Sequence, residues 1–157
     1  TGLGIGYVGA EPGAARWTAA LDRLAAVVGP DAEEFKRVTA ALRRPQLLVL
    51  CAGRPGDEGQ WKAAHEALTD RARNRYAPDI VACGTADTPA GLLIELTGRP
   101  ETAFVAYEDD VTAAIDEFFH FALRRTQDLA RAVLDGDTTA VLVPPAGYRP
   151  ATELLDR

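Results

Sequence analysis

The residues best able to do chemistry follow one apolar run of the chain. Cys51 comes three residues before Arg54 and six before Asp57, so a thiol, a guanidinium and a carboxylate share one short loop. A nearby cation lowers the pKa of a thiol and makes it a better nucleophile, so this loop is the candidate site of a small α/β enzyme. The spacing typical of thiol phosphatases is missing, because an aspartate stands where the arginine is required.

The two histidines offer no evident base for that thiol. His65 shares a predicted helix face with Trp61, and His120 lies between two phenylalanines. Both are expected to be packing or surface residues. They are far apart, with no cysteine or carboxylate at ligand spacing, so they make no zinc motif. The sequence favours a non-catalytic protein and predicts no catalytic residue, no metal ion and no other cofactor.

A glycine-rich string near the start, Gly4-Ile5-Gly6-Tyr7-Val8-Gly9, matches the letters of a dinucleotide-binding loop. That loop needs a strand before it and a helix directly after it, so that the helix N-terminus meets the pyrophosphate. Only three residues precede Gly4, and Glu11-Pro12-Gly13 separates the string from the first predicted helix. We therefore predict no nucleotide site, and interpret residues 1–13 as an irregular or weakly extended opening segment.

Composition and charge narrow the classes of partner. The chain has 157 residues, of which 47% are apolar, and a formal net charge of -6. This length and apolar content predict one domain with a substantial core. An acidic protein without a basic face is a poor partner for nucleic acid or for an anionic membrane. No apolar run is long enough to span a bilayer. We expect a cytoplasmic protein that binds neither nucleic acid nor membrane.

The only two cysteines, Cys51 and Cys83, each end an apolar run that predicts a buried strand. If these strands are neighbours, the two thiols could face each other and act as a redox switch. Disulfide geometry across parallel strands is demanding, so two buried free thiols are the simpler expectation. This favours a reducing compartment.

Two helices are predicted before the first strand. Apolar residues recur at helical spacing from Ala14 onward, and Gly29-Pro30 is expected to end this helix. Asp31 is suited to cap a second helix, which Pro45 stops.

The rest of the chain alternates between apolar runs and helical patterns. Gln46–Cys51 is predicted to be the central strand, because an unbroken apolar run is typical of a strand covered on both faces. Further strands are predicted at 80–83 and 102–107, helices at 61–74, 89–97 and 111–133, and an edge strand or surface arm within 137–157, around 140–143. This alternation predicts an α/β fold with an open, parallel, Rossmann-like sheet and helices on both faces.

Four features occur in a characteristic order between Pro45 and Phe121. The first is the run Cys51-Ala52-Gly53-Arg54-Pro55-Gly56-Asp57, which is followed by Trp61. The second is the apolar run from Ile80 that ends in Gly84, and the third is the run from Phe104 that ends in acidic residues at Asp109. The fourth is the pair Phe118-Phe119 in the last predicted helix. In this order they resemble the C-terminal half of a von Willebrand factor A (vWA) domain of the bacterial tellurium-resistance and stress-system type. The resemblance implies a single, degenerate vWA-like domain over residues 1–157.

Domains of this family hold a divalent cation in a metal-ion-dependent adhesion site. The resemblance places Ala15 where the family has a threonine ligand and Ala52 where it has an aspartate ligand. A hard cation prefers oxygen ligands, which a methyl group does not supply. The chain contains no serine, so the family's Asp-x-Ser-x-Ser motif is missing as well. The resemblance therefore implies a metal site that has lost its function, with Asp57 surviving as a lone carboxylate.

The resemblance implies a non-catalytic interaction or scaffold domain of a bacterial stress or conflict system, whose partner is another protein or a second copy of itself. The expected contact surface is the loop edge, defined by residues 13–16, 51–57 and 84–87, with the candidate residues Ala15, Arg16, Cys51, Ala52, Gly53, Arg54 and Asp57. The missing motif also removes a strand of the family's sheet. We expect a segment outside this chain to complete the sheet beside Gln46–Cys51. A thiol enzyme at Cys51 is the alternative.

Overall fold

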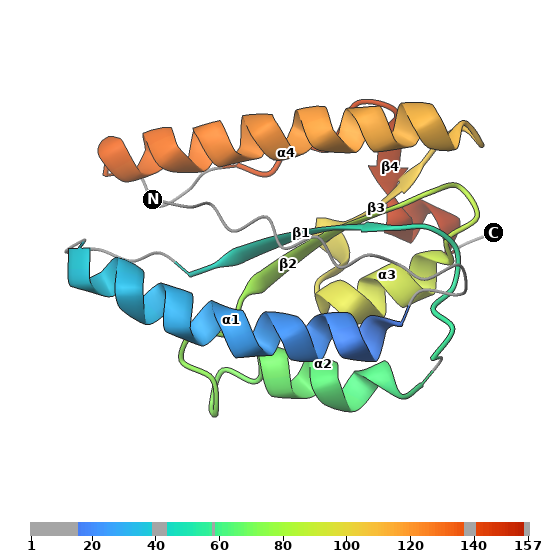
Figure 1. The fold of residues 1–157 in the computed structure, drawn as a ribbon. Coiled ribbons are helices and arrows are strands. Elements are labelled where there is room, and N and C mark those ends of the chain that lie inside the picture. The colour runs from blue at the N-terminus through green and yellow to red at the C-terminus, as the bar shows by residue number, and fades with distance from the viewer. Residues whose placement is uncertain (1–15, 39–43, 58, 137–140, 156–157) are drawn as a thin grey trace. The chain divides into compact units, whose positions relative to one another are not determined.

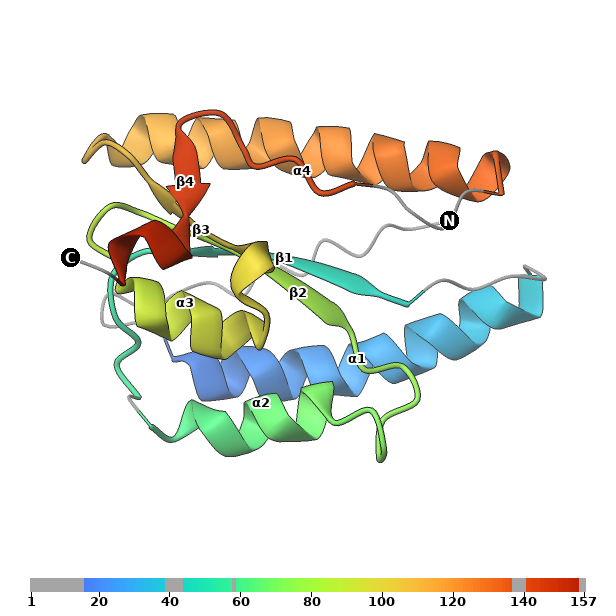
Figure 2. The ribbon, with the colours of Figure 1, turned by 180° about the vertical axis from the view of Figure 1, so that it is seen from behind.

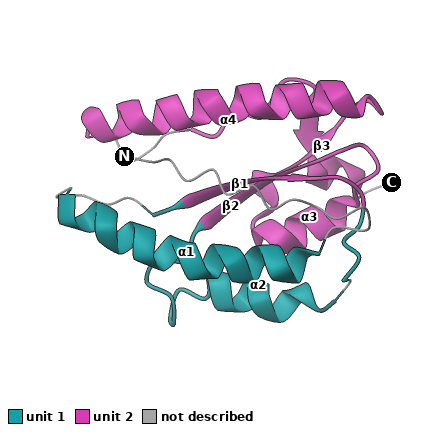
Figure 3. Ribbon diagram, in the orientation of Figure 1, with its two compact units in different colours: residues 1–45, 54–78 teal, residues 46–53, 79–157 magenta. Residues whose placement is uncertain are grey.

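The computed structural model describes residues 16–38, 44–57, 59–136 and 141–155. The predicted opening segment 1–13 and the candidate residue Ala15 lie outside this range. The chain divides into two compact units, one made of Thr1–Pro45 with Arg54–Pro78 and the other of Gln46–Gly53 with Asp79–Arg157 (Figure 3).

The first unit is a pair of packed helices, α1 (Trp17–Val38) and α2 (Trp61–Thr69), which lie side by side in both views (Figures 1 and 2). Trp61 is 1% exposed and is the centre of the contact. Its ring meets the ring of Trp17 edge to face, with centroids 5.1 Å apart, and meets His65 at 5.6 Å. His65 is therefore a packing residue, as its helix face predicts.

Helix α1 continues through Gly29 and Pro30, so the predicted break between two helices is wrong. A proline inside a helix removes one backbone hydrogen bond, but it does not forbid the helix when contacts hold both halves. Leu21 before the proline and Ala32 after it are both buried. Glu33, also after it, accepts a hydrogen bond of 2.6 Å from the hydroxyl of Tyr76. These tertiary contacts on both sides of Pro30 outweigh the local break signal.

The second unit is a four-stranded sheet with the order β1-β2-β3-β4. Its strands are β1 (Gln46–Cys51), β2 (Asp79–Gly84), β3 (Ala103–Ala106) and β4 (Tyr148–Pro150). The first three strands are parallel, and β4 is antiparallel to β3. Helices α3 (Ala90–Thr97) and α4 (Val111–Leu134) cover opposite faces of this sheet (Figures 1 and 2). The predicted α/β class with an open, mostly parallel sheet is confirmed.

The core of the second unit lies mainly between α4 and the sheet. Its buried members are Val81, Cys83, Phe104, Ala106, Ala114, Phe118, Phe121 and Tyr148, with the half-buried Leu48, Leu50 and Leu142 packed against them. Asp110 starts α4, because its carboxylate accepts the N–H of Ala113 at 3.0 Å and so satisfies one free donor of the first turn. On the other face, α3 contributes the buried Leu93 and Leu96.

Strand β1 lies at the edge of the sheet, so its predicted central position is wrong for the described residues. The central strand is β2, in which five of six residues are buried, whereas β1 is only half-buried before Cys51. The apolar run correctly indicates a strand whose side chains need to be buried on both faces of the sheet. It does not indicate which strands pair with this strand.

The C-terminal apolar run is an arm, and the edge strand comes later, at β4. Residues 141–145 form no strand, with Val141 and Val143 exposed. Leu142 between them packs against the core below α4. Of the two predicted alternatives for 140–143, the described part of this run fits the arm.

Candidate functional site

The predicted loop edge is divided between the two units. Cys51 to Gly53 and Gly84 to Asp87 belong to the sheet unit, whereas Arg16, Arg54 and Asp57 belong to the helical unit. The structure brings the ends of β1 and β2 together in the sheet unit, and brings Asp57 to the start of α1 in the helical unit.

In the sheet unit, a network of hydrogen bonds ties the end of β1 to the end of β2. The carbonyl oxygen of Cys51 accepts the N–H of Thr85 at 2.9 Å and the hydroxyl of Thr88 at 3.1 Å. The N–H of Gly53 donates to the Thr88 hydroxyl at 3.1 Å, and the Thr85 hydroxyl donates to Asp87 Oδ1. Thr85 and Thr88 are both buried. These polar groups therefore bond to one another between the loops that follow β1 and β2, and do not face solvent.

Two glycines make this close approach possible. Gly84 ends β2, and a Cβ placed there would lie 2.7 Å from both Leu93 Cδ1 and Thr88 Cβ. Gly53 has a φ of +68°, a region that L side chains disfavour. Pro89 is the N-cap of α3, and the Thr88 hydroxyl before it donates to the carbonyl oxygen of Cys51.

The two thiols are buried and lie on opposite faces of the sheet. Cys51 pairs with Gly84 and Cys83 pairs with Leu50, so the cysteines are offset by one residue, and side chains alternate between faces along a strand. Both are free, as predicted, and the redox pair is excluded by this offset. Burial raises the pKa of Cys51 to about 12, so its thiol is protonated at neutral pH.

In the helical unit, Asp57 caps α1 from a distant loop. Its two carboxylate oxygens accept the N–H of Trp17 at 3.0 Å and the N–H of Thr18 at 2.7 Å. Burial by itself would raise the pKa of Asp57, but the hydrogen bonds from Thr18 and Trp17 outweigh it, and the pKa is lowered. Asp57 is 9% exposed, whereas Arg16 and Arg54 are exposed.

Across the ranges that the structure describes, no three or more histidine, cysteine, aspartate and glutamate side chains gather as a metal site. Within the same ranges, no helix is long and apolar enough to cross a membrane.

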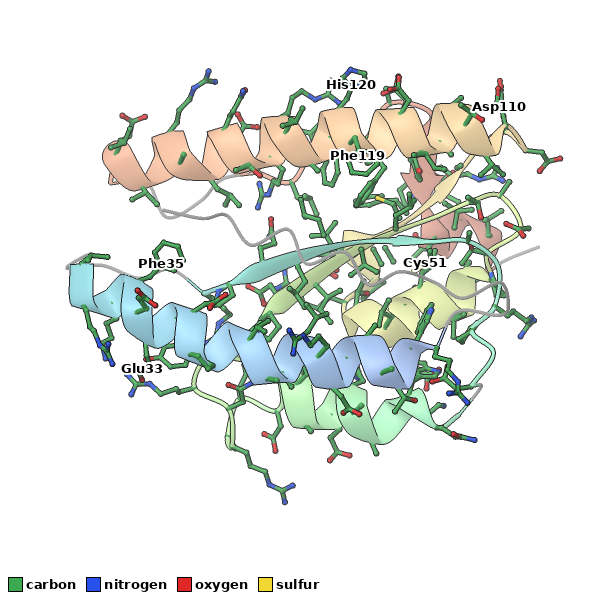
Figure 4. The ribbon with its side chains drawn as sticks, viewed as in Figure 1. Glu33, Phe35, Cys51, Asp110, Phe119 and His120 are labelled. Carbon is green, nitrogen blue, oxygen red and sulfur yellow. The ribbon has the colours of Figure 1, made fainter. Side chains whose placement is uncertain are left out.

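A second surface of the sheet unit was not predicted from the sequence. We define the apolar ridge as Val111, Ile115, Phe119 and Leu123, which follow one another at intervals of four residues along α4 and are 48%, 38%, 60% and 64% exposed. In Figure 4, His120 lies on the side of α4 away from the sheet. Amphipathic spacing predicts a broad apolar stripe on α4, but it cannot say which part the sheet covers.

The ridge winds around α4 and away from the sheet. At 100° per residue, Val111 and Ile115 flank the buried face of the helix marked by Ala114 and Phe118, whereas Leu123 lies on the side opposite that face.

Arg125 holds α4 against the first residue of β1. This side chain is 8% exposed, and burial lowers its pKa. Its Nε donates to Gln46 Oε1 at 2.8 Å, and its NH1 donates to the carbonyl oxygen of Val141 at 3.2 Å. The helix, the edge strand and the C-terminal arm are thereby fixed to one another, with the ridge outside the contact.

Comparison of the chain with protein-family models, with curated proteins and with solved structures finds no match. The fold thus defines the class of this protein, an α/β protein with an open and mostly parallel sheet.

Proposed function

We propose that this chain is a non-catalytic protein-interaction domain, and that its main contact surface is the edge surface. The edge surface consists of the outer edge of β1 (Gln46–Cys51) and the apolar ridge of α4. The resemblance to a vWA domain with a lost metal site is part of the proposal, because such a domain keeps a partner-binding role without metal chemistry.

The observation that carries the proposal is the outer edge of β1, which pairs with no described strand, in a unit whose helix α4 exposes a row of apolar side chains. The carbonyl of Cys51 bonds to Thr85 beyond β2, and backbone groups alternate in direction along a strand. The N–H and C=O groups of Leu48 and Leu50 therefore point away from β2. No strand of the described chain pairs with them. An edge of this kind is a ready template for pairing with another chain.

The chemistry of the edge surface fits a protein partner. The six residues of β1 include no charged residue and no proline, the usual features that block strand pairing. The ridge adds four exposed apolar side chains, and contiguous exposed apolar patches are often interaction sites. Backbone pairing and apolar contact are the two attractions that this surface offers, and an extended polypeptide satisfies both.

The alternative of a thiol enzyme receives less support from the geometry. A nucleophilic cysteine requires a thiolate in a partly exposed, electropositive environment. Cys51 is 3% exposed, and burial alone accounts for its raised pKa. Its carbonyl group serves the hydrogen-bond network between the strand ends, which is a structural role.

Photo-crosslinking tests the edge surface directly. Phe119 is replaced by p-benzoylphenylalanine, and the matched control carries the same replacement at Phe35, which is 58% exposed in the helical unit. We expect covalent protein products from position 119 that disappear when Leu123→Asp is added, and no such products from position 35. Absence of products at 119, or equal products at both positions, contradicts the proposal.

The loop edge predicted from the sequence is a second contact surface in this proposal. Its exposed members include Ala52 in the sheet unit and Arg54 in the helical unit. Arg54→Glu should weaken partner binding, while the exposed Lys62→Glu serves as a control for charge reversal in the same unit. Because the proposed binding needs no metal ion, EDTA should leave it unchanged. A loss of binding in EDTA would contradict this part of the proposal.

A further inference from the structure

We propose that Arg149 of β4, held by the ring of Tyr107, binds an oxyanion at the carboxyl end of the parallel strands. The ligand is a carboxylate or a phosphate group. This inference goes beyond the proposed function, because β4 lies at the opposite edge of the described sheet from β1.

Strand pairing places Arg149 beside the carboxyl ends of the parallel strands. It pairs with Val105 of β3, and Val105 pairs with Gly84, the last residue of β2. Residues paired in this way direct their side chains to the same face of a sheet. A Cβ at Gly84 would meet Leu93 of α3, so the Arg149 side chain lies on the α3 face. Open α/β sheets bind their ligands outside this end of the strands.

The Arg149 side chain is half-buried, and its charge is not paired within the described part of the chain. Its Nε is buried and has no hydrogen-bond partner among these residues. The Nε of Arg125, by comparison, donates to Gln46 at 2.8 Å. A buried donor without an acceptor is unfavourable, and most such groups are satisfied. An oxyanion would supply both the acceptor and the opposite charge.

Tyr107 restricts the guanidinium group without accepting its hydrogen bonds. The Cζ of Arg149 lies over the Tyr107 ring, 5.2 Å from the ring centroid. The face of an aromatic ring attracts a cation, whereas the N–H groups of a guanidinium lie in its own plane. The pair therefore orders the guanidinium and keeps its N–H groups for a ligand. Tyr107 is 56% exposed, so the pair is accessible from solvent.

The chemistry of arginine selects the class of ligand. The planar fork of N–H groups matches two oxygens of a carboxylate or a phosphate, and the opposite charges strengthen the hydrogen bonds. The carboxylates nearest in sequence to Tyr107 do not fill this role. Glu108 and Asp109 are exposed and form no described ion pair with Arg149, and the carboxylate of Asp110 caps α4.

The experiment uses the full chain and follows the Nε–H signals of arginine by NMR. Sodium phosphate and sodium acetate are titrated separately, with sodium chloride keeping the ionic strength constant. We expect a saturable shift of the Arg149 signal, and the anion that binds more tightly identifies the ligand as a phosphate or a carboxylate. The signal of Arg131, an exposed arginine of α4, should not show saturation.

Variants test the role of each group, with binding followed through the backbone amide signals of β4. Arg149→Gln should weaken binding by at least about tenfold, because charge-assisted hydrogen bonds are lost. Arg149→Lys should weaken it as well, since an ammonium group lacks the fork. Tyr107→Phe, which keeps the ring, should bind like the wild type, whereas Tyr107→Ala should bind less tightly. Arg99→Gln is the control, because Arg99 is paired with Glu101.

Three results would overturn the inference. The first is a shift of the Arg149 signal that stays linear in both anions, and the second is an equal response of Arg131. The third is binding that persists in Arg149→Gln while that variant keeps the wild-type fold. None of these results bears on crosslinking through Phe119, so the failure of this inference is distinct from the failure of the proposed function.

Discussion

The carboxylate of Asp57 accepts the backbone N–H of Thr18 at 2.7 Å, across 39 residues of sequence. Its other oxygen accepts the N–H of Trp17 at 3.0 Å, so one side chain satisfies the first two donors of α1. The four N–H groups at a helix start have no partner within the helix, and a negative charge there is favourable. Asp57 thus connects the loop before α2 to the start of α1.

Asp57→Ala should destabilise the protein by about 1 to 2 kcal/mol, because α1 loses its capping acceptor and a favourable charge at its N-terminus. The free energy of unfolding, measured by urea denaturation, checks this value. Asp22→Ala is the matched control, since Asp22 is an exposed carboxylate in the same helix. An equal loss in both variants would show that the capping bonds contribute nothing specific.

The same carboxylate should make stability dependent on acidic pH. The hydrogen bonds from Thr18 and Trp17 lower the pKa of Asp57 from its ordinary value of 3.8. A group with a lowered pKa contributes stability that is complete above the unfolded-state pKa and is lost as the pH falls through the folded-state pKa. The stability difference between wild type and Asp57→Asn should therefore be constant near neutral pH and shrink below about pH 4. A difference independent of pH would contradict the assignment.

Gly84→Ala should destabilise the sheet unit by about 1 to 3 kcal/mol, because the added methyl overlaps closely packed atoms. A Cβ at this position meets Leu93 Cδ1 and Thr88 Cβ at 2.7 Å. Gly91→Ala is the control in the neighbouring helix α3, where the nearest atom is 4.0 Å away. There the change should be neutral or stabilising by up to about 1 kcal/mol, since alanine favours a helix. Thermal or chemical unfolding distinguishes the two variants.

Both thiols should resist modification in the folded protein. Burial raises the pKa of Cys51 to about 12 and raises that of Cys83 as well, so neither forms an appreciable thiolate at pH 8. Reaction with a disulfide reagent should be slow in native conditions and rapid for both cysteines after unfolding in urea. Rapid native reaction of one thiol would indicate an accessible, activated cysteine and would favour the enzyme alternative.

Cys51→Ser should leave partner crosslinking through Phe119 unchanged. In an interaction domain, the side chain of Cys51 only fills buried space at the end of β1, and its carbonyl group is retained in the variant. We expect a stability loss of about 1 to 3 kcal/mol from burying a hydroxyl. The yield of the crosslink measures the outcome. Abolished crosslinking in a variant that is still folded would assign the thiol a functional role.

Local patterns were sufficient for most of the helices and strands. The apolar runs predicted β1, β2 and β3 to within one or two residues, and the helical spacing predicted α4. These signals depend on neighbouring residues only, so a single sequence contains them. The buried state of both cysteines followed from the same runs.

Other features depended on residues far apart in the chain. The continuity of α1 through Pro30 requires Tyr76, and the role of Asp57 requires Trp17 and Thr18. None of these pairs follows from spacing, because the bonds join separate elements. The same holds for the end of β1, where the Thr88 hydroxyl donates to the carbonyl oxygen of Cys51 across 37 residues of sequence.

The sequence by itself determined that this protein is an α/β protein built from parallel strands and amphipathic helices, because periodicity and turn residues act locally. Only the tertiary structure decided that β1 lies at an edge of the described sheet and that Phe119 and its ridge neighbours are exposed, outside the core. The physical reason is that an apolar residue indicates a need for burial but does not indicate which other residues will bury it. That depends on the order of the strands and on how the helices pack on the sheet.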